Sequence, residues 1–178
     1  MIYALLAEGF EEIEALTPVD MLRRAGLEVK TVGIASKEVT GSHGITVVSD
    51  ITPEEIGEEI TMLILPGGMP GSANLDAWEQ MDALLARTLA GGGRVAAICA
   101  APMVLGKRGY LQGKHAVCYP GFEEYLEGAT VTDARVERDG KVITSKGMGA
   151  ALEFGLALVE VLCGKEKAEQ IAGAVFAK

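Results

Sequence analysis

Four short strand-forming segments within residues 1–98 constrain the fold more than any other feature. They cover residues 2–7, 28–34, 62–65 and 95–98, and helix-forming sequence follows the first and the third. Apolar runs of this length are typical of strands that are buried in a parallel sheet. The order of strands and helices predicts an α/β fold, with a mostly parallel sheet and helices on both faces.

The segments between and after these strands predict hairpins and further helices. Residues 39–49 indicate a hairpin or a bulged strand pair, and a second hairpin is expected around Asp139-Gly140. Thr17-Pro18 has the pattern of a new helix start, so we expect the first helix to kink or restart there. The remaining predictions are a strand over 116–119, one or two helical turns over 120–126, and helices over 76–89, 152–162 and 165–176.

The composition limits the class of protein and its partners. A chain of 178 residues fits one domain, residues 1–178, and its net charge of −9 argues against nucleic acid or an anionic membrane as a partner. The three cysteines show no metal-like spacing, which favours free thiols in a reducing compartment. No apolar run approaches the ~20 residues that a spanning helix needs. We therefore expect a cytoplasmic protein with no membrane partner and no metal.

Cys99 is the first candidate for chemistry, because it follows a buried strand and precedes a helix start at Pro102. Small residues on both sides suit a sharp strand-to-helix turn, the arrangement of a nucleophile elbow. At a helix N-terminus the thiolate of Cys99 is expected to be favoured. The alternative is an unreactive cysteine buried for packing, and the local sequence leaves both open.

Glu14 is the second candidate, because it lies between Ile13 and Ala15 where a buried carboxyl needs a hydrogen-bond partner. If Glu14 reaches Cys99, its protonated form is expected to donate a hydrogen bond to the sulfur. A solvated helix glutamate is the alternative, and Glu11 and Glu12 are explained as the exposed start of a helix.

Loop glycines provide the third element of the expected site. Gly67 and Gly68 follow the strand 62–65 directly, and the carboxyl ends of parallel strands meet at one edge of a sheet. Their amides, with the amide of Ala100, form a candidate oxyanion-binding group. A glycine pair alone also fits a simple turn.

The local sequence gives less support for a chemical role of the other cysteines and of the histidines. Cys163 ends a helix and is expected to serve packing, whereas Cys118 is kept as a secondary thiol near Tyr119. His43 and His115 lie in polar loop sequence, and neither is placed beside the cysteine, so a cysteine hydrolase ranks low. A nucleotide-binding module ranks lower, because no G-x-G-x-x-G pattern follows the first strand.

Three segments, 7–14, 65–68 and 96–102, together resemble the signature sequences of the ThiJ/PfpI superfamily, in the branch of the Parkinson-disease-associated DJ-one protein and its bacterial relatives. Similarity continues through 18–26 and 164–166, over nearly the whole chain. The resemblance implies a flavodoxin-like sandwich, a homodimer and a cofactor-free protein. It places the family's oxidation-sensitive cysteine on Cys99 and its partner glutamate on Glu14.

The same resemblance implies two kinds of function. Members convert methylglyoxal or glyoxal to hydroxy acids as a glyoxalase, or act as protein deglycases, so small dicarbonyls or glycated proteins are expected substrates. The alternative is a non-enzymatic oxidative-stress sensor or redox-regulated chaperone, in which Cys99 is oxidised to a sulfinate.

The chain departs from the family at one position. Many members have a histidine where this chain has Tyr119, and a phenol that titrates near pH 10 is a poor proton acceptor at neutral pH. We hypothesise that Tyr119 or His43, as auxiliary residues, partly fills the role of the missing base.

Overall fold

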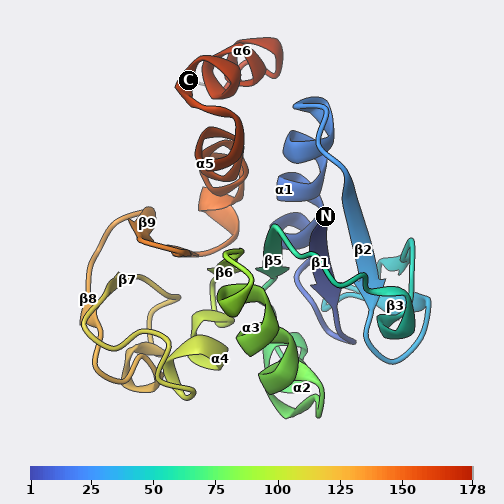
Figure 1. The fold of residues 1–178 in the computed structure, drawn as a ribbon, viewed down its shortest axis with the longest axis vertical. Helices are drawn as coiled ribbons and strands as arrows, with labels where there is room; N and C mark the ends of the chain where they lie inside the picture. Colours follow the sequence, from blue (N-terminus) through green and yellow to red (C-terminus); the bar gives the residue numbers. More distant parts are fainter. Residues whose placement is uncertain (178) are drawn as a thin grey trace.

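A six-stranded sheet forms the middle layer of the computed structural model, which describes residues 1–177 (Figure 1). The strand order is β2-β1-β5-β6-β10-β9. All neighbours pair in parallel except the last strand, which forms an antiparallel hairpin with β10. The mostly parallel sheet and the hairpin around Asp139-Gly140 are therefore confirmed. The strands are β1 (Ile2–Leu6), β2 (Val29–Gly33), β5 (Met62–Leu65), β6 (Arg94–Ile98), β9 (Val136–Asp139) and β10 (Val142–Ser145).

Helices cover both faces of this sheet, as the sequence predicts (Figure 1). Alternate side chains of β1 enter two cores: Tyr3 and Leu5 pack on one side, and Ile2 and Ala4 on the other. One face carries α1 (Glu12–Arg24), α5 (Ala151–Cys163) and α6 (Lys165–Ala174). The other face carries α2 (Gly71–Ala77), α3 (Met81–Ala90) and α4 (Pro102–Gly106).

The first helix runs without interruption through Pro18, so the expected restart at Thr17 is wrong. Proline removes one backbone hydrogen bond from a helix interior, and tertiary packing has to offset that loss. Here α1 packs closely on α5, because Gly155 has no side chain: a Cβ there would lie 2.9 Å from Met21 Cγ and 3.1 Å from Pro18 Cα. The α1–α5 contact keeps the helix continuous.

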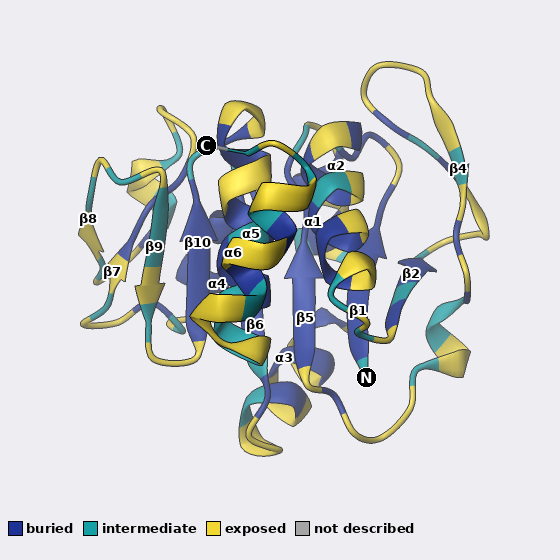
Figure 2. Ribbon diagram, turned by 90° about the horizontal axis from the view of Figure 1, so that it is seen from above, coloured by how far each residue is buried: buried dark blue, intermediate teal, exposed yellow. Residues whose placement is uncertain are grey.

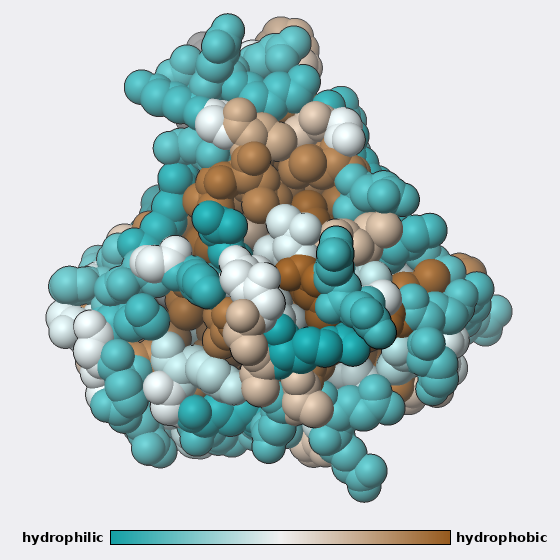
Figure 3. Space-filling model, viewed as in Figure 1, coloured by the Kyte–Doolittle hydropathy of each residue, from teal (hydrophilic) through white to brown (hydrophobic). Residues whose placement is uncertain are grey.

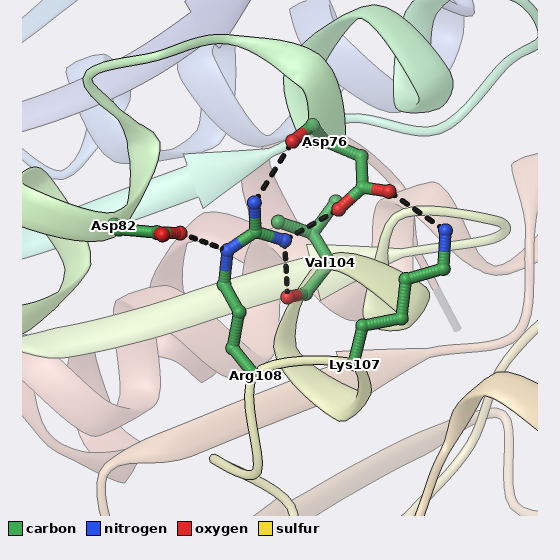
Figure 4. Close-up of polar contacts among 5 residues, drawn as sticks. All are labelled: Asp76, Asp82, Val104, Lys107 and Arg108. Atoms are coloured by element: carbon green, nitrogen blue, oxygen red, sulfur yellow. Dashed lines mark hydrogen bonds and ion pairs between the residues drawn. The ribbon is translucent and has the colours of Figure 1, made fainter.

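The predicted helix over 76–89 is wrong, because the chain forms two helices with an extended residue, Trp78, between them. Arg108, just after α4, holds both pieces (Figure 4). Its guanidinium pairs with the carboxylates of Asp76 and Asp82 and donates to the Asp76 carbonyl at 2.8 Å. Lys107 pairs with the same Asp76 carboxylate at 2.7 Å. These ion pairs fasten α2 and α3 to α4, the helix that follows Cys99.

Two small strand pairs lie outside the main sheet. The hairpin of β3 (Glu38–Thr40) and β4 (Thr46–Val48) projects beyond β2 (Figure 2), and it confirms the prediction for residues 39–49. Beyond β9, β7 (His115–Ala116) pairs in parallel with β8 (Thr130–Val131). The strand expected over 116–119 is therefore shorter, because Val117 bonds instead to the Thr144 hydroxyl. Short 3-10 turns cover Pro53–Glu55, Glu123–Tyr125 and Met148–Ala150.

Within residues 1–177, none of the helices combines the length and the apolar composition needed to cross a membrane. The loops after β1, β5 and β6 all leave the sheet at its carboxyl edge, where the strand order changes direction between β1 and β5. Such a switch point is where open α/β sheets bind ligands. The three predicted site segments meet at this edge.

Candidate active site

Cys99 lies at the turn between β6 and α4, and its backbone is strained. Its φ of +65° is left-handed, a conformation that residues with a side chain adopt rarely and at a cost. Two hydrogen bonds hold the turn: the Cys99 amide donates to the Ser145 carbonyl at 2.9 Å, and the Tyr119 amide donates to the Cys99 carbonyl at 2.8 Å. The predicted sharp strand-to-helix turn is confirmed.

The glycines after β5 bring a second loop against this turn. The Glu11 amide donates to the Gly67 carbonyl at 2.9 Å, which joins the loops after β1 and β5. A Cβ on Gly67 would lie 2.2 Å from Glu14 Oε2 and 2.5 Å from Cys99 Cβ. Gly68 has φ +88°, and a Cβ there would lie 2.5 Å from the Glu11 amide nitrogen. Only glycines allow the acid and the cysteine to approach this closely.

Glu14 lies in the first turn of α1, where the Glu11 side chain caps the helix and accepts from the Glu14 amide at 2.7 Å. Its side chain is directed inward and is only 1% exposed, so the alternative of a solvated glutamate is wrong. Burial raises the pKa of the Glu14 carboxyl to about 7, and the nearby Glu11 charge adds to the shift. The Cys99 thiol and the amides of Gly67 and Met148 oppose it.

One oxygen of this carboxyl, Glu14 Oε2, is buried without a hydrogen-bond partner of good geometry among the described atoms. A buried carboxylate oxygen that accepts no hydrogen bond is costly, and protonation removes its charge. Burial therefore stabilises the protonated form of Glu14 beside Cys99, and with a pKa of about 7 both forms are populated near neutral pH.

Backbone amides converge on the sulfur of Cys99. The amides of Gly68 and Ala100 both hydrogen-bond to it and lower the thiol pKa. The amide of Gly67 is directed instead to the Glu14 carboxyl. Of the three amides expected from sequence to bind an oxyanion, those of Gly68 and Ala100 therefore face the sulfur, whereas that of Gly67 faces the acid.

The thiol of Cys99 does not have the lowered pKa expected from its position before a helix. Burial, followed by the charge of Glu14, raises the pKa of Cys99 to about 12. The five-residue helix α4 and two amides do not offset these effects. Because the two acids are in contact, they titrate as a pair, and the first proton leaves near pH 7. A thiolate then exists when the remaining proton is on Glu14.

The auxiliary candidates occupy different places. Tyr119 is half exposed, and its ring lies next to Gly147, beside the elbow. His43 lies on the β3–β4 hairpin, where its Nδ1 is 2.8 Å from Glu12 Oε2 and its amide donates to Glu12 Oε1 at 2.8 Å. Glu12 is buried, so its assignment to an exposed helix start is wrong. Nothing in the local pattern at Glu12 distinguishes it from Glu11, since its partner is 31 residues away.

The hydrogen bonds and charge of Glu12 raise the pKa of His43. Glu11, Glu12 and His43 each offer one ligand atom within a 4.8 Å grouping, the arrangement that comes nearest to a metal site among residues 1–177. Both Glu12 oxygens already take part in hydrogen bonds with His43 of the hairpin, and Glu11 Oε2 accepts from the Glu14 amide within α1. The grouping is explained as an ion pair.

The remaining cysteines reverse two expectations. Cys163 is exposed at the end of α5, so its predicted packing role is wrong. Cys118 is buried in the core under α4, and burial raises its pKa to about 11, which argues against a secondary reactive thiol.

Replacing Glu14 tests the shared proton. The rate at which iodoacetamide alkylates Cys99, measured from pH 5 to 10, is expected to rise through an inflection near pH 7 in the native chain. Glu14→Gln and Glu14→Leu remove that inflection, because the thiol then titrates alone. At pH 8 we expect the leucine variant to react no more slowly than the native chain, because the charge of Glu14 and its hydrogen bond both raise the pKa of the thiol.

The exposed Glu166→Gln on α6 is the matched control and is expected to retain the native profile. An inflection near pH 7 that persists in Glu14→Leu contradicts the shared proton.

Known proteins share this arrangement of sequence and fold. The family model described as the DJ-1/PfpI family matches residues 1–161. Protein dj-1beta of Drosophila melanogaster is 38% identical over 172 residues, covering 94% of this chain and 92% of the relative. A protein named glutathione-independent glyoxalase in Caenorhabditis elegans is 34% identical over 166 residues, covering 92% and 89%. Protein DJ-1 homolog B of Arabidopsis thaliana is 40% identical, but the chain spans only 39% of its length.

Solved structures are equally similar. A DJ-1 superfamily protein from Salmonella typhimurium superposes with a TM-score of 0.94 at 35% identity, covering 99% of this chain and 98% of the other. The oxidized form of Toxoplasma gondii DJ-1 gives a TM-score of 0.90 at 36% identity, covering 98% and 97%. The fold is thus flavodoxin-like. By the match of its sequence and its fold, the chain belongs to the DJ-1/PfpI family.

Proposed function

We propose that this protein converts small dicarbonyls, such as methylglyoxal or glyoxal, to hydroxy acids with Cys99 as the nucleophile. The observation that carries the proposal is the contact of a strained, partly exposed thiol with a buried acid that binds its proton near neutral pH. The glyoxalase name of the Caenorhabditis elegans relative supports the same reaction. A protein deglycase would act on the adduct of such a dicarbonyl at the same thiol.

The proposed reaction begins when the Cys99 thiolate attacks the aldehyde carbon and forms a carbon–sulfur bond. The amides of Gly68 and Ala100 bind the oxygen of the resulting hemithioacetal. A proton then moves from the former aldehyde carbon to the neighbouring carbonyl carbon through an enediolate, and Glu14 transfers it. This internal redox step gives a thioester, which water hydrolyses to release the hydroxy acid and the thiol. The conversion therefore consumes water and needs no external oxidant or cofactor.

Substitution of Cys99 tests the reaction. In Cys99→Ser, lactate formation from methylglyoxal is expected to fall at least about a hundredfold, because a neutral hydroxyl is a far weaker nucleophile than a thiolate. Chromatographic measurement of lactate checks this, with Cys163→Ser as the control, since that thiol is exposed at the end of α5. Lactate formation by Cys99→Ser at the native rate would refute the proposal.

Oxidation of the same thiol is the second candidate function, and two observations favour it. The relative from Toxoplasma gondii is described as oxidized in its solved structure. The raised pKa of Glu14 also leaves a proton that can be donated to an oxygen of a cysteine sulfinate. In this role each of two peroxide molecules transfers one oxygen to sulfur and leaves as water or hydroxide.

Peptide mass spectrometry after mild peroxide treatment tests this second function. A gain of two oxygens is expected at Cys99 before any gain at the more exposed Cys163. Glu14→Gln is expected to lower the yield of sulfinate, because the carboxyl proton is missing. Oxidation of Cys163 first would rule out a dedicated sensor at Cys99.

We also propose that the chain forms a homodimer through the outer faces of α1 and α5. An apolar patch lies over these helices (Figure 3). Leu16 of α1 and Leu152 of α5 are exposed large hydrophobic residues. A second copy is the occupant we favour, because a two-fold interface places the same apolar patch of both subunits in contact.

Sedimentation velocity tests the dimer. The native chain is expected to sediment at twice its mass of 18.7 kDa, and Leu16→Glu as a monomer, because an unpaired charge would be buried at the interface. Val48→Glu, at an exposed position on the β3–β4 hairpin, is the control. A native monomer, or a Leu16→Glu dimer, would contradict the proposal.

A further inference from the structure

A cleft of about 510 Å³ lies beside the elbow, and the reaction proposed above makes no use of it. Tyr119 and Pro120 form part of its wall, the segment 147–150 forms another part, and Arg135 and Lys146 complete it. Tyr119 supplies an exposed aromatic ring and Met148 an exposed apolar side chain. The cleft therefore combines apolar surface with two cationic groups.

Hydrogen bonds connect the walls of this cleft directly to the reactive pair. Ser145, which precedes Lys146, accepts from the Cys99 amide at 2.9 Å, and its hydroxyl donates to the Arg135 carbonyl at 2.8 Å. Tyr119 donates its amide to the Cys99 carbonyl at 2.8 Å. A Cβ on Gly147 would lie 3.8 Å from Glu14 Oε1. The cleft is thus built from residues that contact the nucleophile and the acid.

Charge distinguishes this cleft from the rest of the molecule. Among the described residues that line it, the charged side chains are Arg135 and Lys146, both positive, although the whole chain carries a net charge of −9. Their counterions face solvent: Lys146 pairs with Asp133, which is 95% exposed, and Arg135 pairs with Glu153 at 2.7 Å, which is 52% exposed. Exposed ion pairs of this kind are weak, so a bound anion can replace these carboxylates.

We propose that the cleft is an anion subsite, which selects reactive carbonyl compounds that carry a carboxylate or phosphate group a few bonds from the aldehyde. This inference rests on the proposed function for the identity of the reacting carbon. Arg135 presents a planar guanidinium that matches a carboxylate or phosphate, and Lys146 adds a mobile point charge. Neutral methylglyoxal uses the thiol and the amides alone, whereas the anionic substrate also binds in the cleft.

Alkylation of Cys99 tests the subsite independently of any turnover. Iodoacetate and iodoacetamide undergo the same reaction, in which the thiolate attacks carbon and iodide leaves, and they differ in charge. The ratio of the two rates therefore reports the electrostatic environment of an anion next to the sulfur. In Lys146→Gln and in Arg135→Gln the ratio is expected to fall about threefold, and further in Lys146→Glu. In the native chain it is expected to fall as salt is added.

Lys141→Gln is the matched control, because this exposed lysine lies in the β9–β10 turn and donates to the Leu89 carbonyl. A ratio that is unchanged in Lys146→Gln and Arg135→Gln, or that falls equally in Lys141→Gln, overturns the anion subsite. Thermal unfolding of each variant shows that a changed ratio does not come from a loosened fold.

Turnover then separates the subsite from the proposed reaction. A methylglyoxal homologue that ends in a carboxylate is expected to show a several-fold higher KM in Lys146→Gln with kcat unchanged, whereas methylglyoxal itself is unaffected. If the alkylation ratio falls but neither dicarbonyl is turned over, the anion subsite stands and the proposed reaction is wrong. If both are turned over and the variants change neither ratio nor KM, the reaction stands and the subsite is wrong.

Discussion

The hydrogen bond from the Glu11 amide to the Gly67 carbonyl is the contact on which the site depends. It joins the start of α1 to the loop after β5, and it exists because neither Gly67 nor Gly68 has a side chain to separate the two loops. Glu14, in the first turn of the same helix, lies in contact with Cys99. The sheet places the loops after β1, β5 and β6 at one edge, and this hydrogen bond holds the first two of them together beside Cys99.

The close approach also determines the chemistry. Burial is the main cause of the raised pKa values of both Glu14 and Cys99. The charge of Glu14 raises the pKa of Cys99 further, whereas the hydrogen bond from the thiol lowers that of Glu14, so the two groups titrate as a pair. The pair therefore stores a proton beside a sulfur that two amides already face. The same arrangement suits the attack of a thiolate on a carbonyl and the protection of an oxidised sulfur, which explains why one geometry supports both candidate functions.

A structural feature can be predicted from the sequence when the residues that cause it are close together in the chain. The elbow at Cys99 is predictable because a buried strand, small residues and a proline at the helix start are adjacent. The break at Trp78 is not predictable, because Asp76 is held by Arg108, 32 residues away. Burial of Glu12 likewise depends on a distant hairpin. The expectation of a lowered thiol pKa is wrong because a helix terminus can be recognised in sequence, whereas the degree of burial cannot.

The left-handed backbone at Cys99 has a consequence for how the family evolves. Glycine or asparagine would fit a φ of +65° with less strain than cysteine, so the reactive residue is kept at a cost in backbone strain. Substitutions that remove the thiol therefore also relieve backbone strain. A lineage that keeps cysteine here does so under continuous selection for its reactivity, and a duplicated copy relieved of that selection is expected to lose the thiol early while it retains the fold.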